Sequence, residues 1–282
     1  MVTVVKYEGI ETALNIMSKS TAQNYLKTDQ YRDSSNLDAR AEIHKRFSAN
    51  PYGWMTWVFD HLLALPANAR ILELGCGPGY LWKENVDRIP SAWDITLSDL
   101  SSGTLDSAWR NLVVTGRNYK FKEIDAQEIP FEEETFDAVI ANHMLYHVPD
   151  RSKALGEIKR VLKTGGRFFA TTVGDDHMRE MMDWYRQVHV DKVWESFANS
   201  FTLENGLEQV RSFFPNMTVS RYEDNLEITE LEPIMAYIRS GIRVAELSEE
   251  ELAKLKSDLE KELNEKGRIF IRKDSGLFEA IK

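Results

Sequence analysis

The sequence predicts an α/β fold with a doubly wound, mostly parallel sheet, and three observations support this prediction. First, an apolar run at 70–74 ends at a glycine-rich turn over residues 75–79, and a helical pattern follows. A buried strand that leads through glycines into a helix is typical of nucleotide sites in open α/β sheets. Second, short apolar segments alternate with helical segments over residues 70–173, as in parallel sheets with right-handed crossovers. Third, 282 residues suffice for one large α/β domain with an appended cap.

The N-terminal residues 1–65 have a helical pattern. Asn50 and Pro51 predict the start of a helix, because Asn is a favoured N-cap and Pro a favoured first helical residue. Apolar side chains then recur at helical spacing from Trp54 to Leu65. Helices are therefore expected before the first strand of the sheet.

The alternating region has its own start and stop signals. Asp150 predicts the N-cap of the helix at 151–163, and Gly165-Gly166 predict its end. The expected strands are 70–74, 93–98, 119–124, 136–141 and 166–173, and the expected helices before the last of them are 79–89, 101–115 and 151–163.

Methionine and aromatic residues crowd a helical stretch at 174–200. They indicate either plain core or an adaptable cap over a substrate cavity. A helix at 202–213 and a strand at 217–223 are expected next.

The C-terminal part contains the best-marked helix of the sequence, from Ser248 to Gly267. Ser248 and Glu251 form a capping-box pattern, and Gly267 predicts the end. Two short apolar segments at 269–271 and 277–281, joined by Arg-Lys-Asp-Ser-Gly, predict a closing hairpin.

Composition excludes several classes of protein. The net charge of −10 is a poor match for a nucleic-acid backbone, so no nucleic-acid partner is expected. Cys76 is the one cysteine, which rules out an internal disulfide, and no Cys/His spacing suggests a metal site. The N-terminus has no signal-peptide pattern, and no apolar run approaches the ~20 residues that a membrane helix needs. We therefore expect no membrane partner and a cytoplasmic location.

The glycine turn is the most specific motif. A dinucleotide fingerprint has the spacing G-x-G-x-x-G, whereas this chain has G-x-G-x-G with Tyr80 at the next position. Glu73 precedes the first glycine by two residues, and a carboxylate there favours a cationic or hydrogen-bond-donating ligand over a pyrophosphate. The resulting E-x-G-x-G-x-G resembles the first motif of class I S-adenosylmethionine-dependent methyltransferases. The resemblance implies a seven-stranded Rossmann-like methyltransferase fold and S-adenosylmethionine as cofactor.

Two further strand ends fit this resemblance. Asp99 follows the second strand and predicts a bond to ribose hydroxyls, although Asp there also suits a helix cap. The resemblance implies that Asp125 accepts from the adenine amino group. The N-terminal Tyr31 and Arg40 are candidates for the methionine carboxylate. The other expected cofactor-binding residues are Glu73, Gly75, Cys76, Gly77, Gly79, Leu100, Ala126, Gln127 and Asn142.

The candidate catalytic bases are His143 and His147, because histidine titrates near neutral pH. His147, close to Pro149, is better explained as a loop-holding residue and is the weaker candidate, and His143 lies nearer the end of the fourth strand. Whether a base is needed depends on the acceptor, since a phenol or alcohol must lose a proton.

The predicted function is methyl transfer to a small organic acceptor at an O, N or C atom by direct displacement. Alternatives are a protein or RNA methyltransferase, a non-catalytic module that binds S-adenosylmethionine, and an NAD-dependent oxidoreductase.

The domain organisation expected with this function has four parts. An N-terminal helical segment at 1–65 covers the cofactor site, and 66–173 form the cofactor-binding core. Helical cap insertions occupy 174–200 and 230–266, and 201–229 with 267–282 supply the remaining helix and closing strands of the core.

Overall fold

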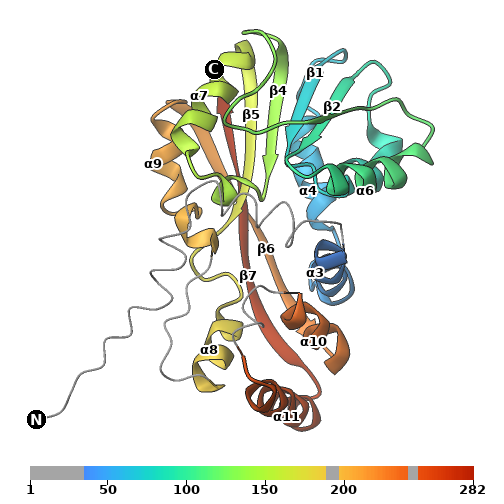
Figure 1. The fold of residues 1–282 in the computed structure, drawn as a ribbon, viewed down its shortest axis with the longest axis vertical. Coiled ribbons are helices and arrows are strands. Elements are labelled where there is room, and N and C mark those ends of the chain that lie inside the picture. Colours follow the sequence, from blue (N-terminus) through green and yellow to red (C-terminus); the bar gives the residue numbers. More distant parts are fainter. Residues whose placement is uncertain (1–34, 189–196, 241–246) are drawn as a thin grey trace, which may run out of the picture.

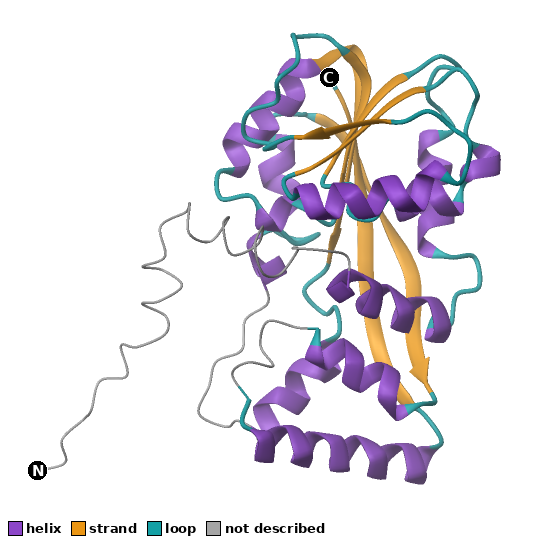
Figure 2. Cartoon of the chain, turned by 45° about the vertical axis from the view of Figure 1, so that its right-hand side comes forward, coloured by secondary structure: helices purple, strands orange, loops and turns teal. Residues whose placement is uncertain are grey.

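The computed structural model describes residues 35–188, 197–240 and 247–282. They form a seven-stranded sheet in the order β3-β2-β1-β4-β5-β7-β6, flanked by helices (Figures 1 and 2). Strands β1 to β5 pair in parallel, and β7 pairs antiparallel with β5 and β6. The mostly parallel, doubly wound sheet predicted from the sequence is confirmed.

The elements have the following bounds. The strands are β1 (Arg70–Leu74), β2 (Asp94–Asp99), β3 (Lys120–Glu123), β4 (Phe136–Asn142), β5 (Leu162–Val173), β6 (Asn216–Ile228) and β7 (Ile269–Ile281). The α-helices are α3 (Ser35–Phe47), α4 (Trp54–Leu62), α5 (Tyr80–Glu84), α6 (Ser102–Val113), α7 (Arg151–Val161), α8 (Arg179–Val188), α9 (Gly206–Arg211), α10 (Leu231–Arg239) and α11 (Glu249–Lys266). Short 3₁₀ turns are η2 (Val86–Arg88), η3 (Leu145–His147) and η4 (Phe197–Ser200).

The sheet separates two hydrophobic clusters, because successive strand side chains point to opposite faces. Leu72 and Val139 belong to the cluster that α7 and α9 cover. Ile71 and Ile140 belong to the cluster that α4, α5 and α6 cover. The central strands are thus buried on both faces, as parallel strands usually are.

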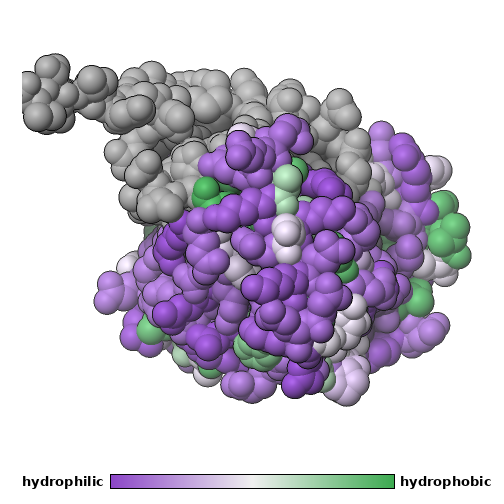
Figure 3. All heavy atoms as spheres, turned by 90° about the horizontal axis from the view of Figure 1, so that it is seen from below, coloured by the Kyte–Doolittle hydropathy of each residue, from purple (hydrophilic) through white to green (hydrophobic). Residues whose placement is uncertain are grey.

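A second lobe is built on the far halves of β6 and β7. Strand β5 pairs with β7 only as far as Val173 opposite Ser275, whereas β6 and β7 stay paired to Ile228 opposite Ile269. Around this two-stranded arm, α3, α8, α10 and α11 form a third hydrophobic cluster. Figure 1 shows the lobe below the main sheet, and its outer surface seen from below is mostly hydrophilic (Figure 3).

Two capping predictions are confirmed. The Asp150 side chain accepts a hydrogen bond from the Lys153 amide at the start of α7. Ser248 and Glu251 form both bonds of a capping box, and Gly267 ends α11 in a left-handed conformation with φ 71°. Local signals alone decide these ends.

The predicted C-terminal hairpin is wrong. Residues 269–281 form one continuous strand that pairs with β6 along its whole length. The segment Arg-Lys-Asp-Ser-Gly suggested a turn, but pairing of all five residues with β6, and of the last two also with β5, overrides its turn propensity. The strand predicted at 217–223 is likewise longer and runs from Asn216 to Ile228.

Several predicted boundaries shift. Gly53, with φ 86°, precedes α4, while the Asn50 side chain accepts from the Tyr52 amide in a turn. The helix predicted at 79–89 divides into α5 and η2, and that at 202–213 shortens to α9. The helix before Gly165 already ends at Val161, where β5 begins.

The partition into an N-terminal segment, core and cap remains a prediction. In the third hydrophobic cluster, the far halves of β6 and β7 pack with the lobe helices rather than with the main sheet. Within the described ranges, no helix combines the length and apolar character needed to cross a membrane.

Candidate active site

The glycine loop after β1 is fastened to the end of β2. The Cys76 amide donates to the Ser98 carbonyl at 2.8 Å, and the Gly77 amide donates to the Asp99 carboxylate at 3.1 Å. Gly79 has φ 77°, and a Cβ there would lie 2.8 Å from the Leu112 side chain of α6. Glycine at this position therefore allows both the turn and the close approach of α6. The Cys76 thiol is buried and its pKa is raised well above the usual value, chiefly by burial, so it is no nucleophile.

Glu73 lies inside the protein and is only 2% exposed. Its two oxygens accept hydrogen bonds from Trp82 Nε1 at 2.5 Å and from Asn142 Nδ2 at 2.9 Å. Burial raises the pKa of Glu73 to about 8, although both donors oppose the shift. The bond between Asn142 and Glu73 joins the end of β4 to β1, two residues before the first glycine of the loop. A buried acid of this kind is ready to lose its proton when a cation binds beside it.

Asp99 has a hydrogen bond on each carboxylate oxygen, one from the Gly77 amide and one from the Ser101 amide at 3.0 Å. The cap of α6 is Ser101 itself, whose hydroxyl accepts from the Thr104 amide. Burial raises the pKa of Asp99, although the hydrogen bonds from these amides lower it. Each carboxylate oxygen can accept a second bond, so Asp99 keeps capacity for a ligand hydroxyl. Leu100, beside it, is partly exposed.

The residues after β3 lie beside Asp99, because the Ile124 amide donates to the Asp99 carbonyl at 3.1 Å. Asp125 accepts from both the amide and the side chain of Gln127, at 2.9 and 3.0 Å. Ala126 between them is buried. The structure thus brings the predicted third-strand residues next to the second-strand acid.

Helix α3 lies against the glycine loop. A Cβ placed on Gly77 would lie 3.9 Å from the Leu37 side chain, and the Tyr80 hydroxyl donates to Asp38. Arg40 instead donates to the carbonyl and hydroxyl of Ser240 at the end of α10, at 2.7 and 3.2 Å. Its charge also contributes to the low pKa of His147. Tyr31 lies outside the described residues.

The two candidate bases have different surroundings. His143 has φ 47°, which is uncommon for a non-glycine residue. Its ring packs on that of Trp54, with the two ring centroids 5.3 Å apart. His147 lies in η3 with its ring on Tyr146 at 4.6 Å. The pKa of each is lowered to about 4, mainly by burial, with the charge of Lys273 acting on His143 and that of Arg40 on His147. Both are neutral at pH 7.

A set of functional candidates on the lobe side of His143 was missed from the sequence. Lys273 and Asp224 form an ion pair in which the two side chains are 6% and 0% exposed. His44 and His177 lie beside them, with ring centroids 6.4 Å apart. A lone histidine gives no signal in a sequence. Lys273 does have a signal in the sequence. It follows Ile269 and Ile271 at alternate positions of a strand, so its side chain lies on the same, inward face.

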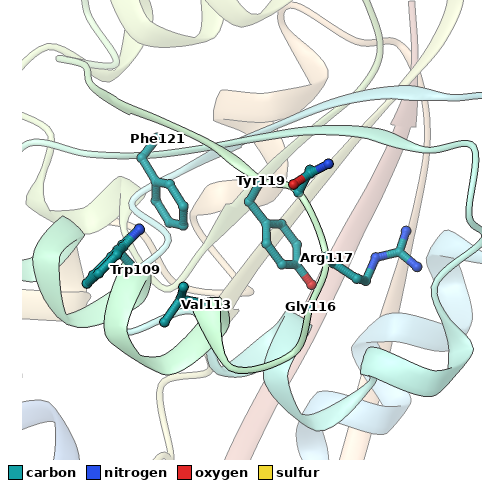
Figure 4. A pocket seen from close by; sticks show the side chains of 7 residues that line it. Trp109, Val113, Gly116, Arg117, Tyr119 and Phe121 are labelled. Carbon is teal, nitrogen blue, oxygen red and sulfur yellow. The ribbon is translucent and has the colours of Figure 1, made fainter.

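A shallow hollow of about 290 Å³ lies elsewhere, between the end of α6 and the start of β3 (Figure 4). Its lining residues are Trp109, Val113, Gly116, Arg117, Asn118, Tyr119 and Phe121. It adjoins the start of β3, whereas open α/β sheets bind ligands at the carboxyl ends of strands. No group of His, Cys, Asp or Glu in the described part of the chain is arranged to hold a metal ion.

Comparisons with known proteins agree with this geometry. A family described as "Methyltransferase domain" matches residues 72–170. Among curated relatives, malonyl-[acyl-carrier protein] O-methyltransferase of Legionella pneumophila is 34% identical over 57% of this chain and 54% of its own length. The ubiquinone biosynthesis O-methyltransferase of Dechloromonas aromatica is 32% identical over 48% of this chain and 56% of its own length. The chain spans about half the length of the curated relatives it matches.

Two solved structures show the same fold. Phosphoethanolamine N-methyltransferase 2 of Haemonchus contortus, in complex with S-adenosyl-L-methionine, has a TM-score of 0.57 and 20% identity, over 93% of this chain and 60% of the other. The [4+2]-cyclase SpnF has a TM-score of 0.57 and 17% identity, over 94% of this chain and 96% of the other. A fold that also carries a cyclase does not by itself define a reaction.

Proposed function

We propose that this chain is a class I S-adenosylmethionine-dependent methyltransferase and that it transfers a methyl group from S-adenosylmethionine to a small organic acceptor. The observation that supports this most is the bond between the Gly77 amide and the Asp99 carboxylate. It fixes the glycine loop at the carboxyl ends of β1 and β2. The strand order reverses between β1 and β4, which is where open α/β sheets bind their ligands.

The residues present fit such a cofactor. The bare main chain of the loop gives room for a ligand at Gly77, and the acids at three strand ends supply acceptors for hydroxyl, amino and cationic groups. The residues proposed to bind it are Glu73, Gly75, Cys76, Gly77, Gly79, Asp99, Leu100, Asp125, Ala126, Gln127 and Asn142, with Tyr31 and Arg40 from the N-terminal segment. Arg40 already donates to Ser240, so only its remaining donor groups are free for a carboxylate.

When bound, S-adenosylmethionine supplies a methyl group on a positively charged sulfur. The chain itself mainly has to align the acceptor with that methyl group, and alignment can supply up to ~7–11 kcal/mol of barrier reduction. His143 follows Asn142 directly and is neutral at pH 7, so it is the proposed proton acceptor for a hydroxyl substrate. His147 is the second candidate; it lies in η3 after β4 and is also neutral.

The proposal extends to partners and location. The acceptor is a small molecule, the acidic chain has no nucleic-acid partner, and the protein acts in the cytoplasm. The acidic charge of the chain disfavours an RNA substrate. The acids and glycines of the cofactor motif are all in place, which disfavours a binding-only role, and Tyr80 in place of the glycine of the dinucleotide fingerprint disfavours an NAD-dependent reaction.

The test is binding of S-adenosylmethionine and S-adenosylhomocysteine by calorimetry, in wild type and Asp99→Asn. A hydrogen bond to a charged group contributes about 1.5–3 kcal/mol, so the variant should bind ~10–100-fold more weakly. Asp94→Asn, at the other end of β2 in a partly exposed ion pair with Lys120, is the matched control and should bind as wild type. A wild-type protein that binds neither compound refutes the function, and equal binding by Asp99→Asn refutes only the role of Asp99.

A further inference from the structure

Three histidines from distant parts of the chain meet where the lobe joins the main sheet. His44 comes from α3, His143 from the end of β4, and His177 from the segment between β5 and α8; they are called here the histidine cluster. The rings of His44 and His177 are 6.4 Å apart, and His143 is near enough to contribute to the low pKa of both. All three residues are partly exposed.

One polar atom of the cluster has no hydrogen-bond partner in the described part of the chain. His44 Nδ1 is buried without a hydrogen bond, which is costly unless a ligand or water satisfies it. His177 Nδ1 accepts from the Asp274 amide at 3.1 Å, so in the neutral ring the proton lies on Nε2, which becomes a donor. Two non-glycine residues with positive φ lie at the cluster, His143 itself at 47° and Met178, next to His177, at 54°. Backbone strain of this kind often accompanies a binding site.

The acids near the cluster are already engaged. The Asp224 side chain is 0% exposed; it pairs with Lys273 and accepts from the Ser48 hydroxyl at 2.6 Å and the Asn50 amide at 3.0 Å. Asp274 is paired with Arg221. Within the described residues, the cluster therefore adjoins the Lys273–Asp224 ion pair, and the carboxylates of Asp224 and Asp274 are both engaged by cations rather than available for a protonated amine.

We propose that the histidine cluster binds an acidic oxygen group of the methyl acceptor, such as a phenol, an enol or a carboxylic acid, and discriminates against a protonated amine. This inference rests on the proposed function and narrows its acceptor class. His177 Nε2–H donates to the acceptor oxygen and positions it, and His143 takes the proton where one is present. The acceptor oxygen then gives an electron pair to the methyl carbon, the carbon–sulfur bond breaks with its electrons on sulfur, and the proton passes from His143 to water.

The position of the cluster suits this role. Asn142, next to His143, bonds Glu73 at the glycine loop, so the proposed acceptor and cofactor sites share the end of β4. The pKa of His143 is lowered to about 4 and that of His177 to about 3, by burial first and then by nearby positive charge. Weak bases match an acceptor that is already acidic, whereas an alkyl alcohol needs a stronger base.

Two substitutions at one position separate binding from structure. Asn places an oxygen near the position of imidazole Nδ1, so His177→Asn keeps an acceptor for the Asp274 amide and loses the distal donor. Gln places a nitrogen near Nε2, so His177→Gln keeps the distal donor. A positioning role predicts weak probe binding in His177→Asn and rescue in His177→Gln; a purely structural role predicts the reverse order. His61→Asn, on α4 beside Glu279, is the control histidine and should bind the probes as wild type.

The probes are 4-nitrophenol, benzoate and benzylamine, each added to protein saturated with S-adenosylhomocysteine. Binding is followed by calorimetry and by the imidazole NMR signals of the cluster. We expect 4-nitrophenol, benzoate or both to bind and to move these signals, with binding at least ~10-fold weaker in His177→Asn; which of the two binds distinguishes a phenol from a carboxylate acceptor. Benzylamine that binds as well as either anion, or anions that leave the cluster signals unmoved, overturns the inference. The affinity for S-adenosylhomocysteine is measured in the same samples. If the protein does not bind this compound, the proposed function fails, and the failure is distinguishable from failure of the acceptor inference alone.

Discussion

The two sides of the β4 tip differ in charge. On the side of the glycine loop, Glu73 and Asp99 bring carboxyl groups together, and both accept hydrogen bonds from protein N–H groups. On the lobe side, neutral imidazoles surround Lys273, whose acid partner Asp224 is already engaged. The change occurs between Asn142 and His143, which are adjacent in the chain. This polarity suits a cationic donor on one side and an electron-rich acceptor on the other.

The two sides also differ in how the chain builds them. The acidic side comes from a single motif and the strand ends next to it in the sheet. The lobe side draws on α3, the segment after β5, β6 and β7, which are far apart in sequence. We therefore expect the acidic side to respond mainly in ligand binding and the lobe side to respond first in stability.

The largest effect is expected at the buried ion pair of the lobe. Lys273→Met leaves Asp224 as an unpaired charge that is 0% exposed, and breaking such a pair costs about 3–5 kcal/mol. Urea unfolding of the variant should show this loss. Lys120→Met removes a comparable pair with Asp94 at the partly exposed end of β2 and should cost at most about 1 kcal/mol. Equal losses in both variants would mean that the lobe pair is solvated like a surface pair.

Restoring the charge balance sharpens this test. Burial alone would raise the pKa of Asp224, but Lys273 and the Ser48 hydroxyl hold it below its usual value. The double variant Lys273→Met, Asp224→Asn should therefore recover part of the stability that Lys273→Met loses. The pKa of His143 and His177 should rise in it, because Lys273 is a cause of their low values.

The same contrast explains what the sequence could predict. The glycine turn, Asp99 and Asp150 carry their roles in local patterns, and the sheet class and capping were predicted from them. The β6–β7 arm was not, because Lys273 and Ser275 have polar side chains whose burial depends on partners more than forty residues away. His44 and His177 have no local signal, since their meeting depends on how α3 and the lobe pack. Tertiary contacts outweigh local propensity in strands of this kind.

The glycine loop offers the next largest effect. Gly79→Ala places a Cβ at φ 77° and 2.8 Å from Leu112. The backbone term costs about 1–2 kcal/mol and the overpacking about 1–3 kcal/mol, so unfolding in urea should show a loss of at least about 2 kcal/mol. Gly116→Ala has a similar φ of 71° but open space around it, and should show the backbone term only. Equal losses would remove the argument that Gly79 permits the close approach of α6.

The last effect is a dependence of stability on pH, which comes from the proton of Glu73. The folded pKa of Glu73, about 8, lies above the unfolded value, so between about pH 5 and 8 the folded state holds a proton that the unfolded state has released. Stability should therefore fall as pH rises through this range, and Glu73→Gln should show a flatter slope. The measurement is urea unfolding at several pH values.

Ligand binding should reveal the same proton. A cation beside Glu73 favours its ionised form, which lowers its pKa and releases a proton. Calorimetry of S-adenosylmethionine binding near pH 7, in buffers with different ionisation enthalpies, should detect release of up to one proton in wild type and less in Glu73→Gln. Proton uptake, or an unchanged release in the variant, would show that Glu73 does not sense the positive charge. The acidic side of the β4 tip would then be a structural hydrogen-bond anchor, and the charge contrast across Asn142 and His143 would lie only on the lobe side.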